Sequence, residues 1–391
     1  MLIGLIGAPN KGKSTIFSAM TLNEVEIADY PFTTISPNLG IAYATKPCPE
    51  KELGVRCNPR NSLCINGIRH IPINITDIAG LVPDAHLGKG MGTQFLNDIM
   101  GADVVIQVVD LSGQTDIHGK PVVGHDPSAE IEMVMKEMAN WLSGIIEKHM
   151  DGLSKKRDGI AALIEILSGF KAEPEQVREA AEENGITTSN IYWNHESSYR
   201  FAMSFLMKNK PLVVAANKLD KADSKALDAL KGKLDAYIVI GCSGAIELAL
   251  RKAAKSKVID YTSGASEFTI NENASSEQRK ALEYMKGYLQ RNKGTGISEL
   301  LNSSVFDACS NIVAYPVENE NKYTDNKGNV LPDAHLLKKG STALDLARKI
   351  HTDIADKMLY AVDARSKKRL GKDYALQDGD VIKIVSAAKS V

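Results

Sequence analysis

The chain has 391 residues, and 43% of them are hydrophobic, which is enough to bury a sizeable core and to form two or three domains. Its formal net charge is −1, so the chain as a whole is not attracted to nucleic acid or to an anionic membrane, and contact with a polyanion would need a local basic patch. No apolar run reaches the length of a membrane-spanning helix and no signal peptide is recognisable, so we expect a cytoplasmic protein without membrane contact. The cysteine count of five is odd, so we expect free thiols rather than a set of disulfides.

The first predicted elements are a strand over 1–6 and a helix over 15–20, joined by the loop Gly7-Ala-Pro-Asn-Lys-Gly-Lys-Ser14. A glycine, four residues and Gly-Lys-Ser form the P-loop pattern, whose backbone N–H groups surround the α- and β-phosphates of a nucleotide. We predict that Lys13 neutralises the β- and γ-phosphates as a catalytic residue and that the Ser14 hydroxyl binds Mg²⁺. The predicted nucleotide-binding residues of this loop are Gly7, Asn10, Lys11, Gly12, Lys13, Ser14 and Thr15.

Three cysteines follow farther along the chain, at Cys48, Cys57 and Cys64, and His70 comes shortly after them. Three thiolates and one imidazole are a suitable ligand set for tetrahedral Zn²⁺, and a metal would stabilise a loop that has few core residues. The spacings match no strong zinc motif, so free or redox-sensitive thiols are the alternative.

A predicted strand over 71–76 ends at Asp77-Ile-Ala-Gly80. This pattern is typical of the second metal motif of a nucleotide switch, although an isolated copy could be an ordinary turn after a strand. We predict that Asp77 holds Mg²⁺ through water and that the Gly80 N–H binds the γ-phosphate as a catalytic group, because only glycine allows that close approach.

The next segments alternate between helix and strand, with a helix over 92–101 and a buried strand over 104–110. Such alternation predicts an α/β fold with a doubly wound parallel sheet, in which a nucleotide lies at the carboxyl ends of the strands. Helical patterns then follow over 128–150, 158–169, 174–184 and 197–208, and we interpret them as a helical, coiled-coil-like insertion over 121–205. An apolar stripe in the first of these helices predicts core packing and contains Ile131, Val134, Met135, Met138, Leu142, Ile145 and Ile146.

Two later loops are predicted to recognise the base. Asn217-Lys218-Leu-Asp220 follows an apolar strand over 211–216, and Ser243-Gly244 follows another over 236–240. The carboxylate of Asp220 can accept hydrogen bonds from both guanine N1–H and N2–H₂, whereas adenine offers no such donor pair, so an Asp at this place favours guanine. The predicted base-binding residues are Asn217, Lys218, Asp220, Ser243 and Gly244.

The C-terminal part predicts a separate sheet with one helix across it. Strands are expected over 312–317, 336–340, 360–362 and 380–385, and a helix over Thr342–Met358 with Ser341 as its N-cap. This order is typical of a β-grasp domain over 310–391. A basic run from Arg365 to Arg369 lies between the last two strands, and such a run is either a solvated loop or a contact for RNA.

Several of these segments resemble one family. Asp29-Tyr-Pro-Phe-Thr-Thr-Ile-Ser-Pro-Asn-Leu-Gly40 is similar to the first switch of the Obg-like GTPases, and Asp77-Ile-Ala-Gly-Leu-Val-Pro83 together with Gly88–Leu96 resembles their second switch. The arrangement of the whole chain is most similar to the YchF subfamily in an archaeal-type form. The resemblance implies that Thr34 is the catalytic metal ligand of the first switch, which reaches Mg²⁺ only while the γ-phosphate is present.

The C-terminal segments over 339–351 and 376–384 resemble a TGS domain, a module that threonyl-tRNA synthetases, some GTPases and stringent-response proteins share. In those families the domain contacts RNA. The resemblance therefore implies that this chain binds the ribosome or RNA through its TGS and helical domains.

One departure from the family, at Asp220, and one difference from Ras-type proteins, at Leu81, affect the expected chemistry. Bacterial and eukaryotic YchF proteins typically carry Asn-x-x-Glu in the base motif and prefer ATP, whereas this chain keeps Asp220, so we expect GTP. Leu81 stands where Ras-type proteins have the glutamine that orients water, and an aliphatic side chain cannot assist proton transfer. Asn10 matches the K⁺ ligand of potassium-activated relatives, so K⁺ could supply charge stabilisation, or Asn10 could only brace the loop.

The sequence thus predicts a Mg²⁺-dependent switch that binds GTP and GDP, hydrolyses GTP slowly and acts on the ribosome or on RNA, as a monomer. The expected domains are a P-loop GTPase domain over 1–120 and 206–309, the helical insertion over 121–205 and the β-grasp (TGS) domain over 310–391. Two alternatives remain open, namely an ATPase on the same scaffold and an RNA-binding module in which the nucleotide is only a structural ligand.

Overall fold

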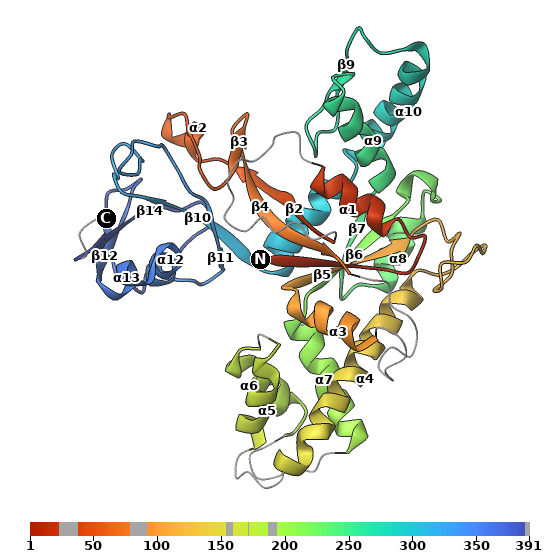
Figure 1. Cartoon of the computed structure of the whole chain (residues 1–391), viewed down its shortest axis with the longest axis horizontal. Helices are drawn as coiled ribbons and strands as arrows, with labels where there is room; N and C mark the ends of the chain where they lie inside the picture. Colours follow the sequence, from red (N-terminus) through yellow and green to blue (C-terminus); the bar gives the residue numbers. More distant parts are fainter. Residues whose placement is uncertain (23–37, 79–91, 154–158, 171, 187–193, 388–391) are drawn as a thin grey trace. The chain divides into compact units, whose positions relative to one another are not determined.

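The computed structural model of the chain describes residues 1–22, 38–78, 92–153, 159–170, 172–186 and 194–387, and Figure 1 labels their helices and strands. The chain divides into two compact units. Among the described residues, the first unit holds 1–22, 38–40 and the described parts of 74–300, and the second holds 41–73 and 301–387. The predicted domain boundaries at 121, 206 and 310 stay predictions.

The main sheet has the strand order β2-β4-β1-β5-β6-β7, and β3 pairs antiparallel with β4. The pairs β4–β1, β1–β5, β5–β6 and β6–β7 are all parallel. Strands β5 and β6 are buried along their whole length, as expected for parallel strands that helices cover on both faces. The predicted doubly wound sheet is therefore confirmed. Its strands are β1 (Leu2–Ile6), β2 (Leu39–Pro47), β3 (Leu63–Ile65), β4 (Ile68–Asp77), β5 (Val104–Asp110), β6 (Leu212–Asn217) and β7 (Ile238–Gly241).

The helices that accompany these strands start close to the strand ends. Helix α1 packs on α9, and a side chain at Gly244 would lie 2.7 Å from Ile16 Cγ1, so this glycine allows the close approach of the two helices. These elements are α1 (Lys13–Thr21), α2 (Glu50–Leu53), α3 (Gly92–Gly101), the 3₁₀ turn Leu219–Lys221, α8 (Ala226–Lys233) and α9 (Gly244–Lys255).

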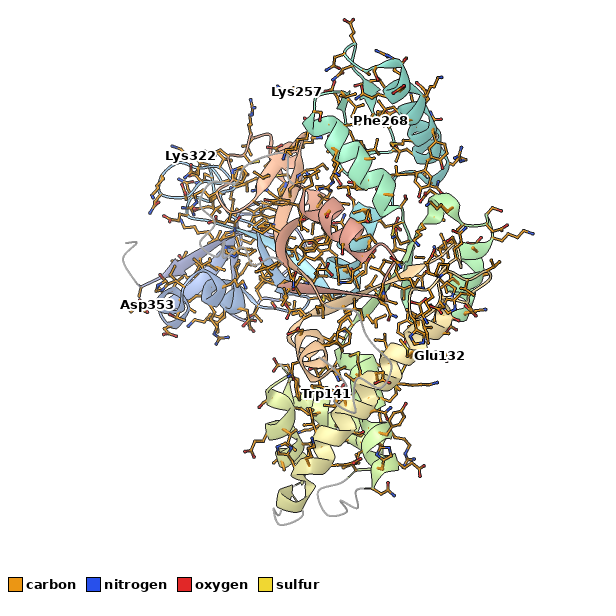
Figure 2. All side chains as sticks on the ribbon, turned by 45° about the vertical axis from the view of Figure 1, so that its right-hand side comes forward. Glu132, Trp141, Lys257, Phe268, Lys322 and Asp353 are labelled. Carbon is orange, nitrogen blue, oxygen red and sulfur yellow. The ribbon has the colours of Figure 1, made fainter. Side chains whose placement is uncertain are left out.

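Four helices lie between β5 and β6, namely α4 (Ser128–Leu153), α5 (Gly159–Ser168), α6 (Pro174–Glu183) and α7 (His195–Asn209). The predicted apolar stripe of α4 faces a core that it shares with α7, and Ile145 is its one partly buried member. Trp141, labelled in Figure 2, packs edge-on against Phe170 at a ring-centroid distance of 5.4 Å. This burial confirms that the methionine-bearing stripe is core.

After α9 the chain forms a small subdomain with its own core. It contains β8 (Ile259–Asp260), β9 (Thr269–Ile270) and α10 (Ser276–Asn292). Phe268, labelled in Figure 2, packs edge-on against Tyr261. Helix α11 (Ile297–Asn302) and a π-helical turn (Ser303–Ala308) follow.

The C-terminal sheet has the order β11-β10-β14-β12-β13, with α12 packed on it. The pair β10–β14 is parallel and the other pairs are antiparallel, which confirms the predicted β-grasp arrangement. The elements are β10 (Asn311–Val317), β11 (His335–Lys338), α12 (Ala343–Ile350), α13 (Thr352–Asp356), β12 (Met358–Asp363), β13 (Arg369–Leu370) and β14 (Val381–Ser386).

One local prediction was wrong, since the single helix expected over 342–358 is two helices and Ser341 is not its cap. Thr342 caps α12 instead, because its hydroxyl accepts from the Asp345 N–H and the Asp345 carboxylate accepts from the Thr342 N–H, which is a capping box. His351 has extended backbone angles that end α12, and its Nδ1 accepts from the Asp353 N–H to start α13.

Candidate functional site

The phosphate loop connects β1 to α1 through three residues with positive φ, which are Asn10, Gly12 and Gly7. A Cβ on Gly7 would lie 2.6 Å from the Val108 carbonyl oxygen, and one on Gly12 would lie 2.3 Å from Asn217 Nδ2. Neither position tolerates a side chain without movement of its neighbours, so both glycines are needed for the loop to lie this close to β5 and β6. The N–H groups of the first turn of α1 start directly after this loop.

Three predicted residues meet at the ends of β1 and β4. These strands are parallel neighbours, and Asp77 is in register with Leu5, just before the loop. The Lys13 ammonium donates to the Asp77 carboxylate and to the Ile78 carbonyl oxygen, and the Ser14 hydroxyl donates to Asp77 Oδ2 at 3.2 Å. The Lys13 ammonium and the Ser14 hydroxyl therefore both contact the carboxylate of Asp77, which is far from them in the sequence.

The hydroxyl of Ser14 and the carboxylate of Asp77 are hard oxygen donors, which is the ligand type that Mg²⁺ takes in proteins. Mg²⁺ binds few protein groups and keeps waters and phosphate oxygens for the rest of its shell, so two adjacent oxygen donors beside a phosphate loop fit this ion. Thr15 is half-buried in the same turn of α1.

Two other predicted loop residues turn their side chains away from Asp77. Asn10 Nδ2 donates to the Gly119 carbonyl oxygen at 3.0 Å. Lys11 is fully buried and donates to the Thr115 carbonyl oxygen at 2.8 Å and to Glu130 Oε1 at 2.7 Å. Burial raises the pKa of Glu130, and the hydrogen bond and charge of Lys11 offset this only in part. For Lys11, the side chain is structural and only the backbone is available to a nucleotide.

The base motifs are linked to the phosphate loop through Asn217. Its Nδ2 donates to the Lys11 carbonyl oxygen at 2.8 Å, and its Oδ1 accepts from the Gly244 N–H at 3.1 Å. The Ser243 hydroxyl donates to Asp220 Oδ1 at 2.7 Å and also caps α9. The structure thus brings the predicted residues of both base loops together with the phosphate loop.

Lys218 adopts a positive φ and donates to Asp110 Oδ2 at 2.8 Å. Burial raises the pKa of Asp110, but hydrogen bonds from Lys218, Ser112 and Thr115 lower it further than burial raises it, so the net shift is downward. We did not predict Asp110, Thr115, Gly119 or Glu130 as part of the site. The position of Asp110 at the carboxyl end of β5, next to β6, is the sequence signal that could have found it.

The predicted switch residues Thr34 and Gly80, with Leu81, lie outside the described residues. Their assignment as metal ligand and phosphate contact therefore stays a prediction.

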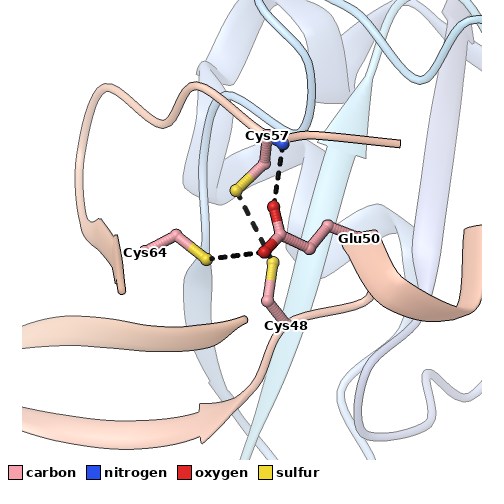
Figure 3. A group of neighbouring side chains, drawn as sticks. All are labelled: Cys48, Glu50, Cys57 and Cys64. Carbon is pink, nitrogen blue, oxygen red and sulfur yellow. Dashed lines mark hydrogen bonds between the residues drawn. The ribbon is translucent and has the colours of Figure 1, made fainter. Parts of the chain in front are cut away.

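The cysteine cluster is a separate site in the second unit, and Figure 3 shows its four side chains. Cys48 follows β2, Cys57 lies in the next loop and Cys64 is on β3, and the fourth member is Glu50, at the start of α2. The predicted fourth ligand was wrong: His70 is on β4, and its Nδ1 lies 3.0 Å from the Ile68 carbonyl oxygen. In the antiparallel pair β3–β4, Cys64 is opposite Arg69 and His70 is the next residue, so Cys64 and His70 point to opposite faces of the sheet, whereas α2 turns Glu50 toward Cys64. Burial raises the pKa of Cys64 to about 11.

Three family models match the chain. They describe a 50S ribosome-binding GTPase over residues 2–156, the G4 motif-containing domain of a YGR210-like Obg-like GTPase over residues 215–319, and a TGS domain over residues 323–386. The last match confirms the predicted C-terminal domain type. Within the described residues, no helix is both long enough and apolar enough to span a bilayer.

Individual relatives match over almost the whole chain. An uncharacterized GTP-binding protein of Methanocaldococcus jannaschii is 47% identical over 99% of this chain and 100% of its own length. The ribosome-binding ATPase YchF of Bacillus subtilis is 26% identical over 97% of each chain. The crystal structure of a GTP binding protein from Pyrococcus horikoshii OT3 superposes with a TM-score of 0.82 at 37% identity, over 99% of this chain and 100% of that chain.

Proposed function

Because the chain belongs to the YchF subfamily of Obg-like P-loop GTPases and carries a C-terminal TGS domain, we propose that it hydrolyses GTP to GDP and phosphate and acts as a nucleotide switch on the ribosome or on RNA. The observation that carries the proposal is the meeting of Lys13, Ser14 and Asp77 at the ends of two neighbouring strands. A lysine, a hydroxyl and a carboxylate at the start of a helix are the groups that a magnesium triphosphate needs.

In this proposal the backbone N–H groups of the loop and of α1 hold the α- and β-phosphates. Lys13 exchanges its bonds to Asp77 and Ile78 for oxygens of the β- and γ-phosphates. Ser14 and Asp77 are the residues that hold Mg²⁺, which when bound neutralises charge that develops on the phosphates. In the GTP form Thr34 is a further Mg²⁺ ligand and the Gly80 N–H binds the γ-phosphate, and both contacts are lost after hydrolysis.

The base pocket supports guanine as the substrate base. Ser243 fixes one oxygen of Asp220, and Asn217 fixes the loop that carries Asp220 against the phosphate loop. A carboxylate held in this way keeps its position for the two adjacent N–H donors of guanine, and a base without them leaves the carboxylate unpaired. The competing function is ATP hydrolysis, which is favoured by the names of relatives such as the Bacillus subtilis ribosome-binding ATPase YchF.

Hydrolysis needs a source of charge stabilisation, since Leu81 cannot orient water. We propose that K⁺ supplies it through Asn10, whose amide nitrogen binds the Gly119 carbonyl oxygen so that its amide oxygen is the atom that can ligate a cation. The same hydrogen bond supports the competing role of Asn10 as a brace for the loop. If K⁺ acts, replacing Na⁺ by K⁺ raises the GTPase rate in the wild type and not in Asn10→Ala; equal rates in the two salts would remove this role.

Binding to the ribosome or RNA is supported by the TGS match and by the name of the Bacillus subtilis relative, ribosome-binding ATPase YchF. The basic run 365–369 is only partly available for this, because Arg365 pairs with Glu52 and Lys367 lies over the Tyr323 ring. Arg369 stacks on Tyr360 at 3.8 Å, and it is exposed together with Lys368, so these two residues are the stronger candidates for phosphate contacts.

The test combines hydrolysis with sedimentation. Purified protein with Mg²⁺ is expected to release phosphate from GTP and not from ATP, and Lys13→Ala is expected to abolish this activity without unfolding the chain. Ribosomal fractions are then sedimented with the protein bound to GDP or to a non-hydrolysable GTP analogue. Phosphate release from ATP alone would overturn the choice of GTP, and equal sedimentation in both nucleotide forms and without nucleotide would favour a constitutive RNA-binding module.

A further inference from the structure

Three thiols and one carboxylate converge in the second unit, and none of them is assigned to the nucleotide. The ligand atoms of Cys48, Glu50, Cys57 and Cys64 all lie within 4.8 Å of one another (Figure 3). The sulfurs of Cys48 and Cys57 are 3.8 Å apart, and Cys64 Sγ is 3.4 Å from Glu50 Oε1. These residues come from the end of β2, α2, a loop and β3, with Cys48 directly after β2, so the fold and not local sequence spacing brings them together.

The Cys48–Cys57 and Cys64–Glu50 separations match those around one tetrahedral zinc ion. With Zn–S bonds of about 2.3 Å and Zn–O bonds of about 2.0–2.2 Å, tetrahedral geometry places two sulfurs about 3.8 Å apart and a sulfur and an oxygen about 3.5 Å apart. Thiolates and a carboxylate are ligands that zinc accepts, and four protein ligands leave no open position. The arrangement therefore has the form of a structural site rather than a catalytic one.

Two groups beside the cluster orient its ligands. The Cys57 N–H donates to Glu50 Oε2 at 2.9 Å, which orients the carboxylate, and the Arg69 guanidinium donates to Cys48 Sγ at 3.5 Å. Arg69 is fully buried. Within the described part of the chain, its other direct partners are neutral: the Ser62 hydroxyl, the Leu331 carbonyl oxygen and the Tyr315 ring. A buried guanidinium needs a negative partner, and a metal-bound thiolate at Cys48 provides one.

The segment that carries these residues has little regular structure, since α2 has four residues and β3 has three. It contacts the TGS domain of the same unit through main-chain bonds from Asn58 to Val330 and from Arg60 to Pro332, and Arg60 also pairs with Asp333. A metal that closes this segment would hold its TGS-binding residues in place. A hollow of about 600 Å³ is lined by Glu50, Cys57 and Cys64 among others, which gives an ion access to the cluster.

We propose that Cys48, Glu50, Cys57 and Cys64 bind one structural Zn²⁺ ion, which fixes the segment 48–67 against the TGS domain. The proposal does not depend on nucleotide binding or hydrolysis, so its test needs neither. Each thiol that binds zinc gives up its proton to solvent, and no cysteine is oxidised.

The full chain is produced in zinc-containing medium, purified without chelator and analysed for metal by mass spectrometry. We expect about one zinc per chain in the wild type and less than about a tenth in Cys57→Ser and Cys64→Ser, with a clear loss in Glu50→Gln. His70→Ala and Cys309→Ser are the matched controls and keep the wild-type zinc content, since His70 is outside the cluster and Cys309 is a buried cysteine elsewhere in the same unit.

A second measurement covers variants that do not fold. Wild-type protein is stripped with a chelator and titrated with Co²⁺, and we expect the visible bands of tetrahedral cobalt together with thiolate-to-cobalt charge transfer. Chelation is also expected to speed proteolysis within 48–67, and added zinc to reverse this. Wild-type protein with less than about a tenth of an equivalent of zinc and no cobalt spectrum would overturn the proposal, as would a disulfide between two of the three cysteines.

Discussion

The Lys11 ammonium lies 2.7 Å from Glu130 Oε1, and both side chains are buried. Lys11 belongs to the phosphate loop, and Glu130 is in the first turn of α4, the helix that follows β5. His125 Nε2 also lies 3.0 Å from the same carboxylate oxygen. The loop expected to hold the triphosphate is therefore joined to the start of α4 by a charge pair shielded from water.

Removing the carboxylate of Glu130 is expected to lower the free energy of unfolding. Glu130→Gln leaves the Lys11 charge buried without a carboxylate, and breaking a buried ion pair in this way typically costs about 3–5 kcal/mol of unfolding free energy. We expect such a loss in urea unfolding and weaker GTP binding in the folded fraction. The matched control is Glu132→Gln, because the Glu132–Lys136 pair is exposed and changes stability little. A wild-type unfolding curve for Glu130→Gln would contradict the structural role of the pair.

Asp220→Asn is expected to change base selection. The amide cannot accept from both guanine donors, so we expect GTP affinity to fall by about 2 kcal/mol, or roughly 30-fold. Xanthosine triphosphate carries a carbonyl in place of the guanine amino group, so its affinity should rise because the new amide can donate to that carbonyl. Titration calorimetry with both nucleotides measures this. Asp223→Asn, three residues away and exposed, should leave both affinities unchanged, and an equal loss for both nucleotides in Asp220→Asn would contradict base recognition by this residue.

Replacing each of two helical glycines by alanine should change the stability of the fold in opposite directions. A Cβ on Gly244 meets Ile16 Cγ1 at 2.7 Å between α9 and α1, so Gly244→Ala is expected to destabilise the fold by about 1–3 kcal/mol. A Cβ on Gly232 in α8 meets nothing within 4 Å, so Gly232→Ala is expected to stabilise by up to about 1 kcal/mol through helix propensity. Thermal unfolding of the two variants checks the signs, and stabilisation by Gly244→Ala would show that α1 and α9 separate readily.

Asp110 is expected to make stability depend on acid pH. Its folded pKa is held below the unfolded value by Lys218, Ser112 and Thr115, in spite of the opposing effect of burial. A depressed pKa stabilises the fold above the unfolded pKa of about 3.9, and this contribution is lost as pH falls through the folded pKa. Unfolding free energies measured downward from about pH 5 should fall less steeply in Asp110→Asn than in the wild type. The exposed Asp235→Asn is the control, and identical slopes for all three proteins would exclude this contribution.

The elements that carry the nucleotide motifs were predictable because their signals are local. The strands over 104–110 and 212–217 are buried throughout and mostly apolar, with Gln107 as the one polar residue inside either strand, and the loop before Lys13 has a fixed spacing of glycines. The cap of α12 was misplaced by one residue, because Ser341 and Thr342 are both good caps and only the reciprocal bonds with Asp345 distinguish them.

The unpredicted parts of the site depend on contacts between distant residues. Glu130 lies 119 positions from Lys11, and no periodicity in α4 distinguishes it from the exposed Glu132. Glu50 was missed for another reason: carboxylates are common on exposed helix starts, and only the turn of α2 brings this one to Cys64.

Asn217 donates to the phosphate loop with one side-chain atom and accepts from the start of α9 with the other. Any substitution at Asn217 disturbs both the phosphate-binding loop and the base-binding loops. A change at this position therefore alters phosphate affinity and base specificity together. Variants that relax base choice while sparing phosphate affinity should instead arise at Asp220 or Ser243, whose mutual bond does not extend to the phosphate loop.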